Sequence, residues 1–252
     1  MTPNEYPQAI LRREAVDTGS LSPVRAVQAV LDPIIREWAG TMLLGLYPSG
    51  SFIKGTANNS GTDIDLFISI SEQTTESLRD IFQMLVRRMR ERGYTHTLQN
   101  VSVTIKVNGY DVDLVPGKRQ NAYTTDHSLY RRKADTWTKT NVSTHIHYVT
   151  AAGRQMESRI LKLWRDQKGL DFPSFYLELT VIDALSGQSG SLADNVLAVL
   201  HYLTNRFPIA RVVDPANTAN TISEDVTGAE KDRIASKAAL ALKATNWKQI
   251  VI

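Results

Sequence analysis

GSFIKGTANNSGTDIDLFISI, residues 50–70, combines a glycine-serine turn, a polar loop and a strand pattern that carries Asp63 and Asp65. Side chains two residues apart in a strand lie on one face of a sheet, so the two carboxylates should lie side by side. They repel each other unless a divalent cation lies between them, and Mg²⁺ binds one or two carboxylates together with phosphate oxygens. Gly50 and Ser51 offer an anion a close backbone approach and a hydroxyl. The stretch therefore predicts metal-assisted chemistry on a nucleoside triphosphate.

The next pattern along the chain predicts a third carboxylate. Asn108-Gly109 is a strong signal for a two-residue hairpin turn between strands in which apolar and polar residues alternate. In the resulting register Asp111 and Asp113 share the polar face. If this hairpin joins the strand of the D-x-D pattern, one of them completes a three-carboxylate site for two metals. The expected pairs are Val103–Leu114, Thr104–Asp113, Ile105–Val112, Lys106–Asp111 and Val107–Tyr110.

An isolated D-x-D pattern would more often be a solvated strand edge. Here the glycine-serine turn before it and the third aspartate after it favour a metal site.

The composition is that of an ordinary globular protein. Of 252 residues, 42% are hydrophobic and 22% are charged, enough for a sizeable core in one large domain or two modest ones. The net charge of +3 is too small to indicate a nucleic-acid or membrane partner by itself. The absence of cysteine excludes disulfides and thiolate zinc sites. No long apolar run or signal-peptide pattern occurs, so we expect a cytoplasmic protein without membrane association.

Helical periodicity surrounds the strand patterns. A helix should begin at Pro23 and be kinked or interrupted by Pro33, and residues 43–47 should form the strand before the glycine-serine turn. Thr74 should cap the next helix, which ends near Gly93. Four arginines crowd the end of that helix: Arg87, Arg88, Arg90 and Arg92. They are interpreted first as a solvated basic face, with a phosphate-binding role as the alternative.

The chain is expected to divide into two parts. Residues 1–150 should form a catalytic lobe with an N-terminal helix, in which residues 116–150 are mainly irregular. Residues 151–252 should form a mainly helical lobe, with a short strand at residues 211–215. Its helices are expected around Trp164, after Pro173, after Ser191 and over residues 229–247.

Three motifs together resemble those of the DNA polymerase β-like nucleotidyltransferases. They are Gly50-Ser51, Gly61-Thr62-Asp63-Ile64-Asp65 and Val112-Asp113-Leu114-Val115-Pro116. Within that superfamily the chain is most similar to the branch of 2′-5′ oligoadenylate synthases, cyclic GMP-AMP synthase and bacterial cyclic-oligonucleotide synthases (CD-NTases), with archaeal CCA-adding enzymes as near relatives. Three later stretches support this branch: Leu161-Lys162-Leu163-Trp164, Pro173-Ser174-Phe175-Tyr176-Leu177-Glu178-Leu179 and Val213-Asp214-Pro215-Ala216-Asn217.

The resemblance implies an α/β (α+β) fold. A mixed sheet with flanking helices would carry Asp63, Asp65 and Asp113, and a helical C-terminal lobe would close over the nucleotide. It also selects Asp113 rather than Asp111 as the third metal ligand. Two Mg²⁺ ions, for which Mn²⁺ can substitute, would be bound by the three aspartates.

The resemblance also implies a set of nucleotide contacts. Gly50 and Ser51 would hold the β- and γ-phosphates, Lys162 would reach the triphosphate, Ser174 would lie near it, and Tyr176 would stack on a base. Several of these residues also have a purely structural interpretation, such as a solvated lysine, a serine in the first turn of a helix, or a core aromatic. The implied nucleotide-binding residues are Gly50, Ser51, Lys54, Lys162, Ser174 and Tyr176.

The function implied is a Mg²⁺-dependent, template-independent nucleotidyltransferase that transfers a nucleoside monophosphate from an NTP to a hydroxyl and releases pyrophosphate. The preferred product is a cyclic or linear oligonucleotide second messenger in antiviral signalling. The expected partners are NTP substrates and an activating nucleic acid or protein. Two alternatives within the enzyme class are transfer to an RNA 3′ end, of the CCA type, and transfer to a small molecule. An alternative of another class is a non-catalytic nucleotide- or RNA-binding protein with the same fold.

Overall fold

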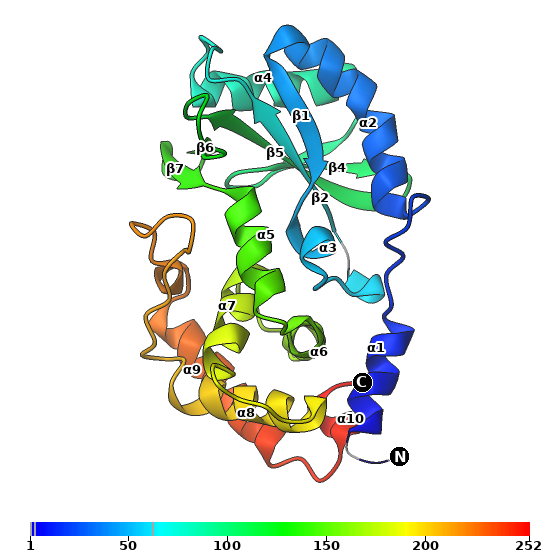
Figure 1. The fold of residues 1–252 in the computed structure, drawn as a ribbon, viewed down its shortest axis with the longest axis vertical. Helices are drawn as coiled ribbons and strands as arrows, with labels where there is room; N and C mark the ends of the chain where they lie inside the picture. Colours follow the sequence, from blue (N-terminus) through cyan, green and yellow to red (C-terminus); the bar gives the residue numbers. More distant parts are fainter. Residues whose placement is uncertain (1, 3, 62) are drawn as a thin grey trace. The chain divides into compact units, whose positions relative to one another are not determined.

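The computed structural model describes residues 2, 4–61 and 63–252. The chain forms two compact units, drawn in Figure 1. The first, called here the sheet unit, consists of Asp17–Gly55 and Gly61–Ile146. The second, called the helical unit, consists of Met1–Val16, Thr56–Ser60 and His147–Ile252. Thr62, part of the G-T-D-I-D motif, lies outside the described residues.

The sheet unit is built on a seven-stranded mixed sheet. Its main order is β1-β2-β5-β4-β3, with β6 paired to β5 and β7 paired to β6. β2 and β5 run parallel, and the other pairs are antiparallel. The strands are β1 (Leu43–Pro48), β2 (Ile64–Ile70), β3 (His96–Leu98), β4 (Val103–Val107), β5 (Tyr110–Arg119), β6 (His127–Arg131) and β7 (Thr136–Thr140).

The hairpin register predicted from the Asn108-Gly109 turn is confirmed. β4 and β5 pair Thr104 with Asp113 and Val103 with Leu114, and the other three expected pairs also form. Asn108 has φ 51° and Gly109 has φ 86°, the left-handed backbone that this kind of turn needs. Because β5 also pairs with β2, the hairpin joins the strand of the D-x-D pattern, as expected.

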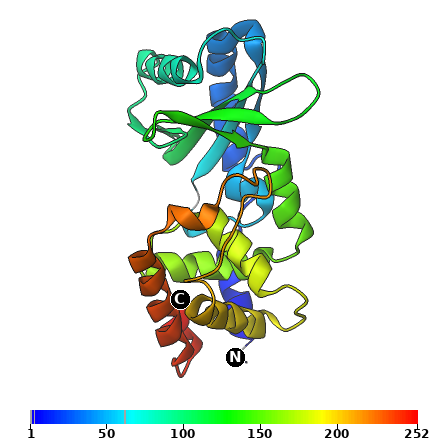
Figure 2. The ribbon, with the colours of Figure 1, turned by 90° about the vertical axis from the view of Figure 1, so that its left-hand side faces the viewer.

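Two helices cover one face of the sheet: α2 (Pro23–Ala39) and α4 (Leu78–Glu91). Figure 2 shows both on the same side of the strands. Their apolar stripes are buried against strand residues that alternate with the polar positions, including Leu66 and Ile68. Of the two expected effects of Pro33, a kink or an interruption, the interruption is wrong, because α2 continues through this residue. The buried positions of α2, Val27, Leu31 and Ile35 among them, hold both sides of the proline against the sheet.

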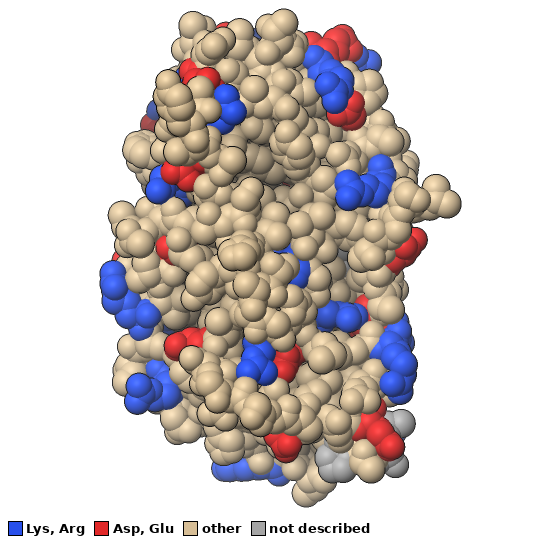
Figure 3. Space-filling model, in the orientation of Figure 1, with Lys and Arg blue, Asp and Glu red and all other residues tan. Residues whose placement is uncertain are grey.

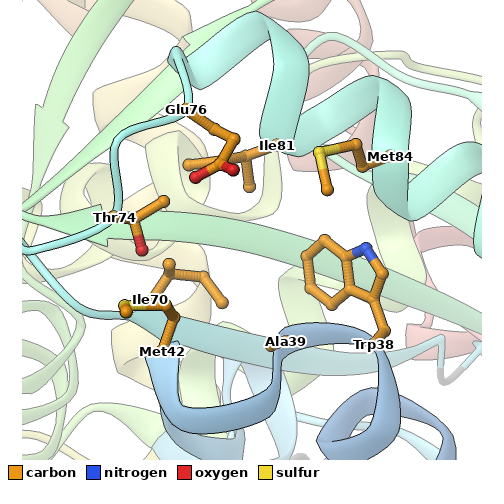
Figure 4. A pocket seen from close by; sticks show the side chains of 8 residues that line it. All are labelled: Trp38, Ala39, Met42, Ile70, Thr74, Glu76, Ile81 and Met84. Atoms are coloured by element: carbon orange, nitrogen blue, oxygen red, sulfur yellow. The ribbon is translucent and has the colours of Figure 1, made fainter.

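A second correction concerns the start of α4. Ser77, rather than Thr74, caps this helix, because the Ser77 hydroxyl accepts a hydrogen bond from the Asp80 backbone N–H at 3.1 Å. Thr74 instead lines a small cavity of about 130 Å³, where α2 and α4 meet the end of β2 (Figure 4). The Thr74 side chain is 7% exposed, and its hydroxyl has no hydrogen-bond partner within the described part of the chain.

The different roles of Ser77 and Thr74 can be tested by measuring the free energy of unfolding of variants at each position. Ser77→Ala is expected to lower the free energy of unfolding by about 1 kcal/mol, because the cap is lost. Thr74→Val keeps the shape and removes a buried hydroxyl without a partner, so it should leave the free energy unchanged or raise it by up to about 1 kcal/mol. Urea denaturation measures both. A larger loss for Thr74→Val would mean that Thr74 supports the helix start.

The expectation of an irregular section over residues 116–150 is also wrong. β5 continues to Arg119, β6 and β7 form a hairpin at the edge of the sheet, and α5 (Val142–Ala151) follows. The apolar residues in this section are sparse because the hairpin buries only one face, which weakens the sequence pattern.

The helical unit has its own core. Trp164, Tyr176 and Phe207 are fully buried in it, and Ile10 and Leu11 of the N-terminal helix join it. In place of the strand expected at residues 211–215 there is a single bridge between Asp214 and Asn217. The helices are α1 (Glu5–Arg13), α6 (Gln155–Gln167), α7 (Ser174–Ala184), α8 (Leu192–Asn205), α9 (Gly228–Leu242) and α10 (Trp247–Ile250). The helical unit also contains the short helix η3 (Ile222–Asp225), and the sheet unit contains the short helices α3 (Gly50–Lys54) and η1 (Gly40–Met42). The short helix η2 (Asn59–Gly61) lies where the chain passes from the helical unit back to the sheet unit.

The division into units differs from the expected one at the N-terminus. The boundary between Ile146 and His147 is close to the expected position, but α1 belongs to the helical unit. Arg159 of α6 explains this, because its guanidinium donates to the carbonyl oxygens of Leu11 and Glu14 at 3.2 and 2.7 Å. None of the helices that the structure describes combines the length and apolar character needed to cross a membrane.

Candidate active site

The structure brings two of the three candidate metal ligands together. Asp65 on β2 and Asp113 on β5 are direct neighbours in the parallel register, and both are half-buried. Asp63 lies one residue before β2 and is exposed. Among the described residues, no three or more His, Cys, Asp or Glu side chains lie together in an arrangement that could bind a metal ion. The sheet thus fixes the Asp65–Asp113 pair and leaves Asp63 outside the strand pairing.

Asp113 is oriented by the strand on its other side. The Thr104 hydroxyl on β4 donates a hydrogen bond to Asp113 Oδ1, across the antiparallel pair of the predicted hairpin. Thr104 therefore positions one carboxylate oxygen while the other stays available. The sequence predicted this pairing, but sequence reasoning did not assign the hydroxyl a role.

The glycine-serine turn lies directly against this pair. The backbone N–H of Ser49 donates to the carbonyl oxygen of Asp65 at 2.8 Å, and Gly50 has φ +60°. A Cβ added at Gly50 would lie 1.7 Å from Asp65 Oδ2, so only glycine fits. The turn and the carboxylates therefore share a small space that a side chain would fill. These oxygen donors, next to a backbone open to phosphate, fit Mg²⁺.

Ser51 and Lys54, the two candidate nucleotide-binding residues that follow Gly50 in α3, differ in how far they are buried. Ser51 is half-buried in α3. Lys54, at the end of α3, is buried at 8% exposure, so it is not a surface charge.

Lys162 is part of a buried ion pair in the helical unit. Its ammonium donates to Glu178 Oε1 at 2.6 Å, to the Thr56 hydroxyl at 3.0 Å and to the Thr56 carbonyl at 3.3 Å. These three acceptors match the three N–H donors of an ammonium group. A contact between Lys162 and a triphosphate would therefore require one of these bonds to be exchanged. Sequence reasoning missed Glu178, although a glutamate between leucines in an apolar helix is a visible signal of a buried partner.

The expectation that Tyr176 stacks on a base is wrong in this structure. The Tyr176 ring is 0% exposed and stacks on Phe207, with ring centroids 4.9 Å apart. Burial raises the pKa of its hydroxyl to about 12. The neighbouring Phe175, in the first turn of α7, is half-buried and packs against the same core with part of its ring. Ser174, beside it, is also half-buried, and its hydroxyl accepts from Arg165 at 3.0 Å.

A cavity of about 510 Å³ adjoins the aspartate face of the sheet unit. Phe67 and Ser69 line it, and both share the face of Asp65 because side chains alternate along β2. Ser69 Oγ lies 2.8 Å from His127 Nε2, and His127 Nδ1 lies 2.8 Å from the Thr125 carbonyl oxygen. A carbonyl only accepts, so Nδ1 carries the proton and Nε2 accepts from Ser69. Sequence reasoning missed this pair because His127 lies in the section expected to be irregular, so its pairing beside the predicted strand of Ser69 was not foreseen.

The burial of His127 makes the sheet unit sensitive to acid. Burial lowers the pKa of His127 from 6.5, with a further lowering from the Arg119 charge. The unfolded chain then binds a proton at a pH where the folded protein does not. The free energy of unfolding should therefore fall as the pH drops from about 7.5 to about 5.5. Denaturation across this range should show a shallower slope for His127→Gln, and an unchanged slope would contradict the assignment.

The sheet order, the Asp65–Asp113 pair on adjacent parallel strands and the glycine-serine turn against them agree with the fold that the polymerase β-like resemblance implies. No family model matches the chain. Among curated proteins it is similar to the cyclic AMP-AMP-AMP synthase of Escherichia coli (strain MS 115-1), with 22% identity over 251 residues, 83% of this chain and 78% of that protein.

Two solved structures show the same architecture. The E. coli MS115-1 CdnC:HORMA-deltaN complex matches with a TM-score of 0.76 and 20% identity, over 95% of this chain and 89% of that chain. Elizabethkingia meningoseptica CdnE cyclic dinucleotide synthase with GTP and Apcpp matches with a TM-score of 0.75 and 12% identity, over 96% and 99%. The predicted α/β fold and the resemblance to the CD-NTase branch are therefore confirmed.

Proposed function

We propose that this protein is a metal-dependent, template-independent nucleotidyltransferase that joins nucleotides into a cyclic or linear oligonucleotide messenger. The observation that carries this proposal is the in-register pair of Asp65 and Asp113, with the Gly50 backbone close against Asp65. The similarity to a cyclic AMP-AMP-AMP synthase supports the product class. A role in antiviral signalling follows from the same resemblance.

The proposed roles of the aspartates follow from the resemblance, and the positions of Asp65 and Asp113 agree with them. Asp63 and Asp65 would bind both of two Mg²⁺ ions, and Asp113 would bind the one next to the acceptor. When bound, such ions neutralise phosphate charge and lower the pKa of a coordinated hydroxyl. Thr104 holds Asp113 in one orientation, and the turn at Gly50 and Ser51 binds phosphate oxygens through its backbone and hydroxyl.

The structure supports two nucleotide contacts besides the phosphates. We assign base stacking to Phe175, with Ser174 beside it, because Tyr176 is buried. The cavity at Ser69 and His127 has the size and the mixed apolar and polar lining to hold the base of the acceptor nucleotide. Lys162 is assigned to the triphosphate by exchange of one of its present hydrogen bonds.

The aromatic assignment separates two neighbouring residues. Phe175→Ala is expected to raise the KM for NTP about tenfold with little change in stability, because base–aromatic stacking contributes about 1–3 kcal/mol. Tyr176→Ala should instead lower the free energy of unfolding by about 3–5 kcal/mol, as a large ring leaves the core. Tyr176→Phe, which removes only the hydroxyl, is the matched control and should keep both properties. If Tyr176→Phe weakened NTP binding, Tyr176 rather than Phe175 would be the residue that contacts the base.

We also propose an activating partner. Figure 3 shows basic and acidic side chains interspersed on the face drawn, without a continuous basic surface there. A solved relative was captured with HORMA-deltaN. The complex with HORMA-deltaN supports a protein as the activator, and a nucleic acid stays the alternative.

Purified protein incubated with all four labelled NTPs and Mg²⁺ or Mn²⁺ tests the function. Products are treated with phosphatase and identified by mass spectrometry, with the Asp63→Ala/Asp65→Ala variant as control. Phosphatase-resistant products absent from the control establish oligonucleotide synthesis. Label transferred only to added RNA would establish 3′-end tailing instead. NTP binding without any product, also after addition of candidate activators, would favour the non-catalytic alternative.

A further inference from the structure

A second cavity of the sheet unit concentrates positive charge. It has a volume of about 320 Å³ and is lined by eight residues from α4, β3 and the β6–β7 hairpin. Three of them are arginines, and none is acidic. The lining residues are Phe82, Gln83, Val86, Arg87, Arg90, Leu98, Tyr130 and Arg132.

This cavity lies on the face of the sheet opposite to the aspartates. Ile70 lines the same small cavity as Ile81 of α4, and Ile70 shares the face of Leu66 and Ile68. Asp65 points to the other face because side chains alternate along β2. α4 therefore covers the face away from Asp65, and a ligand beside α4 would not compete with a substrate at the aspartates.

The arginines of this cavity differ from their neighbours on α4. Arg88 and Arg92 both pair with Glu37. The side chains of Arg87 and Arg90 are exposed and form no ion pair or hydrogen bond with any described residue. Arg87 also lines a neighbouring cavity with Glu37 and Glu91, but no carboxylate lines the cavity that it shares with Arg90. The guanidinium groups of this cavity repel one another, and an anion relieves that repulsion through charge-assisted hydrogen bonds.

Arg132 is the third arginine of the cavity, and its side chain is the one that hydrogen bonds hold in place. Its guanidinium donates to the carbonyl oxygens of Gln99 at 3.1 Å and of Leu98 at 3.3 Å. These bonds use two of its five N–H groups, so the remaining donors stay available in a fixed orientation. A cation held in place by backbone carbonyls binds an anion with less loss of side-chain entropy.

The floor of the cavity is apolar and partly aromatic. Phe82 is 2% exposed, and the Tyr130 ring meets it edge-on with centroids 5.7 Å apart. The Tyr130 hydroxyl donates to Asp135 at 2.7 Å, which fixes the ring. Val86 and Leu98 complete this floor. A ligand that fits the whole cavity therefore has a flat apolar body and an anionic group at one end.

We propose that this cavity is an effector site for an aromatic phosphate ester. The aromatic body packs on Phe82, Val86, Leu98 and Tyr130, and the phosphate pairs with the three arginines. Phosphate favours guanidinium because its oxygens accept parallel N–H bonds. A mononucleotide and a non-nucleotide metabolite share this chemistry. The site is independent of the chemistry proposed at the aspartates.

Binding of 1-naphthyl phosphate, followed by its fluorescence, tests the site on the full chain. We expect saturable binding that weakens with added salt, and much weaker binding of 1-naphthol or inorganic phosphate alone. Arg87→Ala/Arg90→Ala should weaken binding about tenfold or more, because two charge-assisted contacts are lost. Arg92→Ala removes a cation directly after the same helix that does not line the cavity, so it is the matched control and should change the affinity less than about twofold.

Three outcomes would overturn the proposal. They are unchanged binding by the double arginine variant, equal binding of 1-naphthol, and binding of RNA without binding of any monophosphate. Competition by AMP distinguishes a nucleotide source from another phosphate. Binding should persist in Asp65→Asn/Asp113→Asn, so the site stands or falls separately from the nucleotidyltransferase function. Thermal unfolding with and without the probe checks that each variant is folded.

Discussion

Asp113→Ala is expected to abolish nucleotidyl transfer, lowering kcat by about 10³-fold or more, while NTP binding is retained in part. Asp113 lies beside Asp65 in the parallel register, and Thr104 fixes one of its oxygens. Removing this carboxylate takes away the proposed ligand of the acceptor-side metal. Asp65 and the glycine-serine turn remain, so the triphosphate keeps its phosphate contacts.

The matched control for this variant is Asp111→Ala. Asp111 lies on the same strand and polar face, but it is exposed and pairs with Lys106 at 3.5 Å. Its loss should leave kcat within about twofold, because an exposed ion pair contributes little. Single-turnover kinetics with saturating NTP, together with equilibrium binding of a non-hydrolysable analogue, separate chemistry from binding. Wild-type turnover by Asp113→Ala, or an equal loss in Asp111→Ala, would refute the assignment.

Gly50→Ala should have the second largest effect. The added Cβ would lie 1.7 Å from Asp65 Oδ2, and the residue would have to keep φ near +60°. The turn must therefore move away from the carboxylate, which separates the phosphate-binding backbone from the metal ligands. We expect kcat/KM to fall about 100-fold or more, with weakened NTP binding. The free energy of unfolding should fall by about 1–3 kcal/mol.

Gly93→Ala isolates the steric part of that effect. Gly93 has φ +81°, but a Cβ added there meets no atom within 4 Å. This variant carries a comparable backbone strain in the same unit, far along the chain from the turn, and should keep wild-type kcat/KM. Steady-state kinetics and urea denaturation of the two variants measure the difference. If both lose activity equally, backbone strain rather than the contact with Asp65 explains the effect of Gly50→Ala.

Most of the candidate site on the sheet was predictable from sequence. The alternation along β2 places Asp65 on the polar face, and the Asn108-Gly109 turn sets the register that brings Asp113 beside Thr104, whereas Asp63 lies one residue before the strand and its place beside Asp65 stays a prediction. Both are local rules, a period of two and a turn type, that act within a few residues of the chain. The same kind of rule predicted the helices at Trp164 and after Ser191.

The exact start of α4 was not predictable in this way. Thr74 and Ser77 are both good caps, and the chain offers both within four residues. The burial of Thr74 between α2, α4 and β2 decides for Ser77. Which of two equivalent local signals is used depends on packing.

The sequence by itself determined the hairpin register and the face that carries Asp65 and Asp113, because these follow from periodicity and turn chemistry, and its motifs indicated the fold class through their resemblance to a known superfamily. Only the tertiary structure decided that Tyr176 is fully buried while Phe175 is half-buried, and that Lys162 pairs with Glu178 and Thr56. It also decided that α1 joins the helical unit. These outcomes depend on contacts between residues far apart in the chain, whose burial and partners no local pattern specifies.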